Sequence, residues 1–211
     1  MSTSRIERRR RQVESEVDAV VAGLGGSIDD RRAAANLLQR MVRRELPGGL
    51  DPLRESFMGG PVRDHVAHVL GDTEDPRTCT DLLAAIGFAR DRLLSHATWS
   101  DRTAPGDLDE WDRWVRPLAL RHLDGEDSVA VRAATVLAQA GADEGWQGWQ
   151  AVLARSLRDL ALFDYVLVTC PPPGQERAAA LSATLAHKRS RVRASGTLAD
   201  IDRVLSRLVQ S

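Results

Sequence analysis

Five tryptophans stand out in this chain of 211 residues, which contains only one tyrosine and three phenylalanines. Trp111 and Trp114 are three residues apart, as are Trp146 and Trp149, so each pair can share one face of a helix. Trp99 precedes the first pair. We favour the interpretation that these rings pack between helices, as large apolar side chains usually do. The alternative is an aromatic cleft that binds a cationic base or a peptide.

A basic run near the C-terminus is a second candidate binding site. Its members are Lys188, Arg189, Arg191 and Arg193. Such a run can contact nucleic acid or an acidic partner, or it can compensate the dipole if it lies in the last turns of a helix. The N-terminal run Arg8–Arg11 lacks the second explanation, because cations near a helix start are mildly unfavourable. Either run is therefore a candidate nucleic-acid contact.

Metal and nucleophile chemistry have weaker signals. His65 and His68 have a spacing that can bind a metal, but no third ligand lies at helical spacing, so we expect no metal site and no cofactor. Cys79 lies at an expected helix start, where a lowered thiol pKa is conceivable. Cys170 precedes three prolines and is expected at a buried helix end. The sequence has no phosphate loop and no Ser/His/Asp grouping, so we predict no catalytic residue.

The charge is balanced overall and uneven along the chain. The net charge is −1, but residues 1–50 carry ten bases against seven acids, residues 51–150 ten against eighteen, and residues 151–211 nine against five. The acidic middle disfavours a continuous phosphate-binding surface through the centre. No apolar run reaches the roughly 18 residues of a membrane helix, and two distant cysteines favour a reducing compartment. We expect a soluble, cytoplasmic protein with no membrane contact.

Apolar residues recur at helical spacing nearly throughout, which predicts one all-α domain over residues 1–211. The run Phe163–Thr169 is rich in β-branched and aromatic residues but lacks alternation, so we interpret it as a buried central helix. The expected helices cover about 4–22, 27–46, 51–57, a pair within 61–97, one from residue 107, a pair within 128–155, and then 175–192 and 198–210.

Several residues predict where these helices begin and end. We expect the glycines at 23, 25 and 26 to end the first helix in the left-handed conformation. Ser27 and Asp30 predict a capping box for the second helix. Pro117 is expected to kink or end a helix near Arg116. The prolines at 171–173 predict a stop, residues 100–107 a loop, and Thr197 with Asp200 the cap of the last helix.

Two segments repeat a pattern. The first runs from Val62 to Pro76 and is followed by an apolar run; the second runs from Val131 to Asp143 and is one residue shorter between the matching valine and aspartate. Asp75 can cap the helix that begins at Pro76, because proline lacks the N–H that is unpaired at that position anyway. The second copy has glutamate in place of the proline. Both copies open Val-Arg, with Arg63 and Arg132, which could pair with an acid in a neighbouring repeat.

Both segments resemble the HEAT repeat of the bilin-lyase type, a helical hairpin. The resemblance implies an α-solenoid of HEAT-like antiparallel hairpins, a fold that commonly serves as a binding scaffold. We therefore expect a non-catalytic scaffold or regulator that binds a partner protein. The alternative is a nucleic-acid binder, in the extreme an enzyme similar to the HEAT-like alkylpurine DNA glycosylases. That resemblance implies a cleft of tryptophans and a nearby aspartate, for which Asp101, Asp109 and Asp112 are the local candidates.

Overall fold

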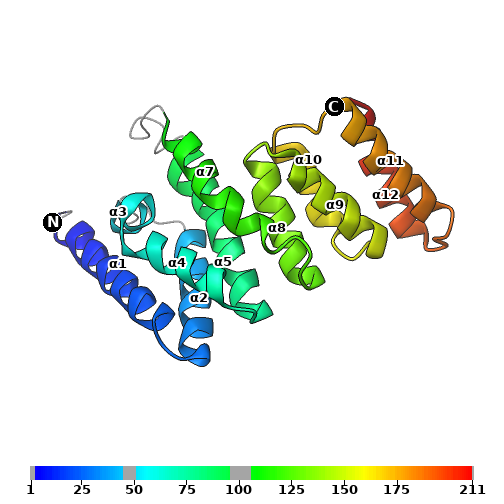
Figure 1. Cartoon of the computed structure of the whole chain (residues 1–211). Coiled ribbons are helices and arrows are strands. Elements are labelled where there is room, and N and C mark those ends of the chain that lie inside the picture. Colours follow the sequence, from blue (N-terminus) through cyan, green and yellow to red (C-terminus); the bar gives the residue numbers. More distant parts are fainter. Residues whose placement is uncertain (1–2, 45–50, 96–105, 211) are drawn as a thin grey trace. The chain divides into compact units, whose positions relative to one another are not determined.

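The computed structural model describes residues 3–44, 51–95 and 106–210. These residues form eleven α-helices and one π-helical segment and no strand, which confirms the all-α class (Figure 1). Where the sequence predicted one domain, the chain divides into two compact units, residues 1–118 and 119–211. We refer to them as the N-terminal unit and the C-terminal unit. In the described part of the chain no helix is both long and apolar enough to span a membrane.

In the N-terminal unit the structure describes six α-helices and one π-helical segment. They are α1 (Thr3–Leu24), α2 (Ile28–Arg43), α3 (Asp51–Gly59), α4 (Pro61–Asp72), α5 (Pro76–Ala89), the π-helical η1 (Arg90–Ser95) and α7 (Asp107–Leu120), within which the boundary between the units falls. The apolar residues that recur at helical spacing along α1 form a buried stripe at Val13, Val17, Val20 and Leu24. The sequence therefore predicted both the helices and the face that α1 buries.

The turn between α1 and α2 differs from the expected mechanism. The glycines at 23, 25 and 26 do not have positive φ; among the described residues only Gly106 and Gly141 do. Gly23 is needed for another reason, because an added Cβ would lie 2.8 Å from the Cβ of Ala34 on α2. A side chain at position 23 would push the two helices apart, so this glycine permits their close approach.

The helix α5 packs most closely against α2, and contacts its chain neighbour α4 much less. The resemblance to a HEAT hairpin predicts instead that the two helices expected within residues 61–97 are antiparallel neighbours. The small side chains explain the difference: α2 buries Ala34 and Ala35, and α5 buries Ala84 and Ala85, so these backbones can approach. The helix α4 instead directs its valine-rich stripe toward a core shared with α1 and α3.

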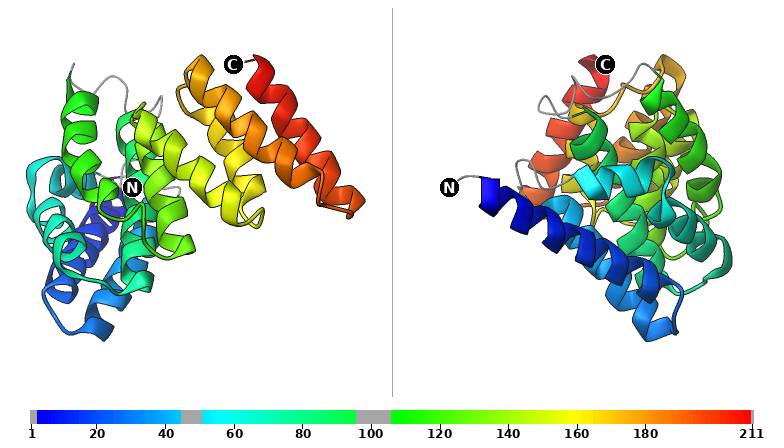
Figure 2. Two further views of the ribbon diagram at one scale, coloured as in Figure 1. Left: turned by 45° about the vertical axis from the view of Figure 1, so that its right-hand side comes forward. Right: turned by 90° about the vertical axis from the view of Figure 1, so that its left-hand side faces the viewer.

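The C-terminal unit contains five helices: α8 (Asp127–Gln139), α9 (Asp143–Arg155), α10 (Leu160–Thr169), α11 (Gln175–Arg189) and α12 (Ser195–Gln210). The closest packing is that of α8 against α9, followed by α11 against both α9 and α12. The left view of Figure 2 shows α11 (orange) beside α12 (red). The helix α10 contacts α8 and α12. Trp146, Trp149 and Phe163 are the largest side chains of the core that these helices share.

Glycine also explains the tight α8–α9 hairpin. A Cβ added at Gly145 would lie 2.7 Å from the carbonyl carbon of Leu137 and 2.9 Å from the carbonyl oxygen of Ala134. A Cβ added at Gly148 would lie 3.0 Å from the Cβ of Ala134. The second repeat copy, which departs further from the HEAT pattern, therefore forms the closer hairpin.

Two expectations about helix ends need correction. The helix α7 continues through Pro117 to Leu120, because the proline lies in the last turns and removes only one backbone hydrogen bond there. Thr197 and Asp200 lie inside α12, which begins at Ser195, so they do not cap it. Asp107 is the first residue of α7, after Gly106 with φ +98°, and the loop expected over 100–107 lies mostly outside the described residues. The run 163–169 is helical, and α10 stops before the prolines, as predicted.

Candidate functional site

Three of the tryptophans are core residues. Trp111, Trp146 and Trp149 are 2%, 2% and 0% exposed. The ring of Trp149 lies 5.2 Å from that of Phe163, and the ring of Trp111 lies 5.4 Å from that of Phe57. A ligand can stack only on an accessible ring face, so these three rings do not form the aromatic cleft that was the alternative interpretation. Trp99 lies outside the described residues.

Trp114 is half-buried, and one of its faces is already covered. Its ring meets Trp111 edge-on at 5.0 Å between centroids, and the guanidinium of Arg63 lies 5.2 Å from the ring centroid. Arg63 also donates to Glu110 at 2.6 Å, so this repeat arginine pairs with an acid of a later helix, as expected. The tryptophan therefore belongs to a cation–π and ion-pair contact between α4 and α7.

The carboxylates near these tryptophans do not form a catalytic arrangement. Asp112 accepts two hydrogen bonds from Arg90, at 2.7 and 2.8 Å, and Asp109 is exposed. Asp101 lies outside the described residues. Within residues 106–118, which carry the pair Trp111 and Trp114, no aspartate faces an open aromatic pocket of the glycosylase-like kind.

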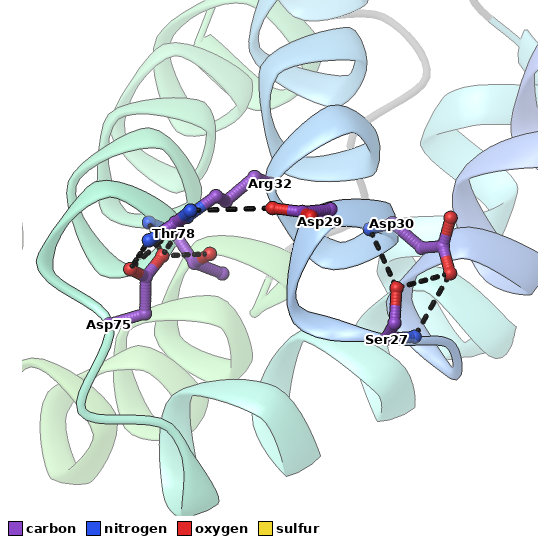
Figure 3. A network of polar contacts seen from close by, with 6 residues as sticks. All are labelled: Ser27, Asp29, Asp30, Arg32, Asp75 and Thr78. Atoms are coloured by element: carbon purple, nitrogen blue, oxygen red, sulfur yellow. Dashed lines mark hydrogen bonds and ion pairs between the residues drawn. The ribbon is translucent and has the colours of Figure 1, made fainter.

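A polar network joins the starts of α2 and α5 (Figure 3). Arg32 donates to Asp75 through Nη2 at 2.7 Å and through Nε at 3.2 Å. Asp75 also accepts from the backbone N–H of Thr78 at 2.9 Å and from its hydroxyl at 2.6 Å. Asp75 is thus the N-cap of α5, as predicted, and it also binds α2, which nothing in the local sequence indicated because Arg32 is 43 residues away.

The surroundings of Asp75 keep it ionised. Its side chain is 5% exposed. The Arg32 guanidinium, and after it the Thr78 hydroxyl and N–H, hold the pKa of this carboxyl well below its usual range, although burial acts in the other direction. The same figure shows the predicted capping box of α2, in which Asp30 and Ser27 exchange hydrogen bonds with each other's backbone N–H. Both groups act as structural caps.

A second Arg–Asp pair joins the starts of α9 and α11. Arg177 donates to Asp143 through Nη2 at 2.9 Å and through Nε at 3.2 Å, and it donates to Gln150 at 3.2 Å. The arginine lowers the pKa of Asp143 below its ordinary value. Here the carboxylate side chain is 54% exposed. It occupies the position that the repeat alignment matched to Asp75.

Basic side chains join the opposite ends of the same two helix pairs. Lys188 on α11 donates to the carbonyl of Arg155, the last residue of α9, at 3.3 Å. In the N-terminal unit, Arg92 on η1 donates to the carbonyl of Arg44, the residue after α2, at 3.3 Å. Cations at the carbonyl end of a helix compensate its dipole. In each pair the two helices therefore start next to each other and end next to each other, so they run in the same direction. We call α2/α5 and α9/α11 the two parallel pairs.

The predicted basic run thus divides into two halves. Lys188 contacts the end of α9, and Arg189 binds Asp202 on α12 at 2.5 Å, so both stabilise packing within the C-terminal unit. Arg191 and Arg193 follow α11, are exposed, and have no acidic partner among the residues that the structure describes. Only this second half remains accessible for binding a partner.

The cysteine and histidine signals lead to structural roles. Cys79 is buried and its thiol donates to the carbonyl of Thr73 at 3.6 Å. Burial, reinforced by the charge of Asp75, raises the pKa of this thiol to about 11, so the lowered pKa considered from the sequence is wrong. Cys170 is buried and caps the end of α10, as predicted. In the described ranges no three His, Cys, Asp or Glu side chains are grouped to hold a metal.

One accessible surface was missed from the sequence. The helix α10 buries Leu160, Phe163, Val166 and Leu167 on one side, but Tyr165 and Val168 on its other side are 53% and 59% exposed. Asp164 is the only charged residue of this helix and binds Arg207 at 2.8 Å. The expected buried central helix is thus buried on one side only. A helix that is apolar all round normally lies wholly inside a protein, and this pattern was the available signal.

The chain matches no known protein-family model, and neither a curated protein nor a solved structure is significantly similar to it. A function must therefore be argued from the surfaces described above.

Proposed function

We propose that the protein is a non-catalytic scaffold, an α-solenoid of HEAT-like hairpins, which binds a partner protein in the cytoplasm through the exposed apolar side of α10. The observation that carries this proposal is the pair Tyr165 and Val168. These are large apolar side chains, more than half exposed, on a helix with no polar face of its own. Exposed tyrosines beside aliphatic residues are typical of protein-binding surfaces.

The internal contacts support a rigid role. In each unit, a parallel helix pair is joined at its starts by an Arg–Asp pair and at its ends by a basic side chain on a carbonyl oxygen. Contacts at both ends of a helix restrict sliding and rotation. A scaffold needs this rigidity, because a partner that binds a fixed surface loses less conformational entropy on association.

The enzyme alternative has less support. Its proposed aromatic cleft would use Trp111 and Trp146, which are buried, and Asp112, which is bound to Arg90. The pKa of Asp75 is lowered by its ion pair and cap, which serve the packing of α5. Such perturbed groups are common in structural ion pairs as well as in active sites.

The test compares two double variants of the full chain as bait in nuclease-treated extract of the native cell. Tyr165→Glu with Val168→Glu places charges on the exposed side of α10. Ile28→Glu with Val209→Glu is the matched control, because these apolar residues are also exposed, at 52% and 83%, and lie on other helices. Partners identified by mass spectrometry are then purified and titrated against each protein.

We expect a stoichiometric protein partner whose Kd rises at least tenfold with the α10 variant and changes less than about threefold with the control, since exposed aromatic anchors contribute most of the energy of such interfaces. Circular dichroism must show equal helicity for all three proteins. A partner that binds the α10 variant normally contradicts the proposed surface. The absence of any stoichiometric partner contradicts the scaffold role.

A further inference from the structure

The first turns of α1 carry the densest positive charge on the molecule. Five arginines occur within seven residues, at positions 5 and 8–11. Every side chain from Arg5 to Gln12 is exposed except the half-buried Arg9. Figure 2 shows the N-terminal end of α1 (dark blue) extending outward from the helices that pack against it. We call residues 5–12 the basic arm.

Most of this charge is not neutralised within the chain. Arg10 pairs with Glu14 at 3.0 Å, whereas Arg5, Arg9 and Arg11 have no ion-pair partner among the described residues. Glu16, further along α1, binds Arg44 at 2.8 Å. The one acid within the arm is Glu7, which is exposed. The arm therefore has a net charge of about +4, from five arginines against one glutamate.

The position of the arm makes this charge unfavourable for the isolated protein. The N-terminal end of a helix already carries a partial positive charge, and acids normally occupy its first turn. The first turn of α1 has none. Arg5 lies in this turn and repels the helix dipole, and the arginines three and four residues apart repel one another. This arrangement becomes favourable only when an external anion lies beside the arm.

The arginines also face the same way. At 100° per residue, Arg5, Arg8, Arg9 and Arg11 fall within an arc of roughly 160°. The centre of this arc lies roughly 130° from the buried stripe that contains Val13 and Val17, and the half-buried Arg9 lies at the edge of the arc next to that stripe. Four cations thus occupy about 9 Å of helix length, at 1.5 Å per residue. This spacing of one charge per roughly 2–3 Å lies between the roughly 1.7 Å per charge of duplex DNA as a whole and the roughly 3.4 Å per charge of one of its strands.

We propose that the basic arm binds the phosphate backbone of double-stranded DNA. The guanidinium of arginine binds phosphate in a bidentate way, and one helix fits the width of the DNA major groove. An interfacial helix on a membrane would need an exposed apolar face, but the arm offers only Ile6, at 53% exposure. This binding is independent of the proposed scaffold surface on α10.

The test is a titration of a labelled 20-base-pair duplex with the full chain between 50 and 200 mM salt. In the arm variant, Arg5, Arg8, Arg9 and Arg11 are replaced by Gln. In the control variant, Arg40, Arg77, Arg113 and Arg158 are replaced by Gln, which changes the net charge equally at four exposed arginines outside both basic runs. A third variant replaces the same four arm residues by Lys, which keeps the charge.

We expect the wild type to bind with a log–log salt slope of roughly −3, as for three to four phosphate contacts. The arm variant should lose about 100-fold in affinity at 50 mM salt and most of its slope, while the control variant should change less than threefold. The Lys variant should retain most of the binding. Equal melting temperatures for all proteins establish that folding is intact.

Three results would overturn the proposal. The wild type does not bind the duplex at 50 mM salt, the control variant loses as much affinity as the arm variant, or the protein binds vesicles that contain phosphatidylserine but not the duplex. The last result would make the arm a membrane contact. All three leave the proposed partner-binding surface of α10 unaffected, because that surface is tested with nuclease-treated extract.

Discussion

The two parallel pairs, α2/α5 and α9/α11, are joined by the same chemical groups but with very different burial. In the N-terminal unit, Asp75 is 5% exposed and is both the N-cap of α5 and the partner of Arg32. In the C-terminal unit, the matching Asp143 is 54% exposed and binds Arg177 without capping α9. The first contact therefore lies at the edge of the core, and the second lies in solvent.

A single residue accounts for this difference. The segment from Val131 to Asp143 is one residue shorter than the segment from Val62 to Asp75. Asp143 is consequently the first residue of α9, and Ala142, which has no side-chain oxygen, occupies the cap position. An ion pair in water contributes little, whereas a buried, hydrogen-bonded carboxylate is costly to disrupt. The predictions below test whether this difference in burial becomes a difference in stability.

The largest effects should be the same in both units, because their tryptophans are equally buried. We expect Trp111→Ala and Trp146→Ala each to reduce the free energy of unfolding by about 3–5 kcal/mol, through lost burial and the cavity that remains. Urea denaturation followed by circular dichroism measures this. The half-buried Trp114→Ala should cost less. An unchanged midpoint for Trp111→Ala or Trp146→Ala would show that the ring is exposed in solution and would restore the aromatic-cleft interpretation.

Close helix packing should be more sensitive in the C-terminal unit. We expect Gly145→Ala to cost about 1–3 kcal/mol or more, since the new methyl group would lie 2.7 Å from a backbone atom of α8. Gly23→Ala should cost less, because the nearest atom is the methyl group of Ala34. Thermal melts compare the two variants. Gly196→Ala is the control: nothing lies within 4 Å of its added Cβ, so it should be neutral or slightly stabilising. Equal losses at positions 145 and 196 would refute the steric explanation.

The two matched aspartates should differ by roughly 1 kcal/mol. We expect Asp75→Ala to cost about 1–2 kcal/mol, because it removes an N-cap and leaves Arg32 without this partner. Asp143→Ala should cost about 0.5 kcal/mol or less, as for other exposed ion pairs. Denaturant midpoints measure both. Asp75→Asn keeps a capping side chain and should recover part of the loss. Equal costs for the two alanine variants would show that burial does not distinguish the contacts.

The smallest effect concerns pH. The pKa of Asp75 in the folded protein lies below its unfolded value of about 3.9, so the unfolded chain takes up this proton first as the pH falls. The stability from Asp75 is therefore fully present above about pH 5, and it decreases as the pH falls through 4 toward the folded pKa. The difference in unfolding free energy between wild type and Asp75→Asn should shrink from pH 7 to pH 3. A difference that is constant with pH would contradict the ion pair. Asp143→Asn should show a weaker trend in the same direction.

Local features of the fold could be predicted because they depend on residues close in sequence. The capping box of Ser27 and Asp30 and the cap of Asp75 on the N–H of Thr78 both span three residues. The prolines after Cys170 stop α10 for a similar reason, since each lacks the N–H that continues a helix. Pro117 is the exception. It removes one backbone hydrogen bond, but α7 continues past it to Leu120.

The candidate surfaces were less predictable, because accessibility depends on packing. The spacing of the tryptophans indicated shared faces, but spacing does not distinguish a face toward the core from a face toward solvent. The same limit applies to α10, where an apolar pattern indicated full burial and Tyr165 is 53% exposed. Lys188 and Arg191 are three residues apart in one basic run. Lys188 contacts the carbonyl at the end of α9, whereas Arg191 stays exposed, and the sequence does not show this difference.

The helical class, the positions where most helices begin and end, and the basic ends and acidic middle of the chain all follow from the amino-acid sequence. These properties follow from side-chain periodicity, from caps that act over one turn, and from composition. Only the tertiary structure decided that Arg32 binds Asp75 across 43 residues, that α5 packs most closely against α2, and that one side of α10 remains exposed. The physical reason is that such contacts depend on how closely backbones approach, and small residues such as Ala34 permit an approach without specifying the partner.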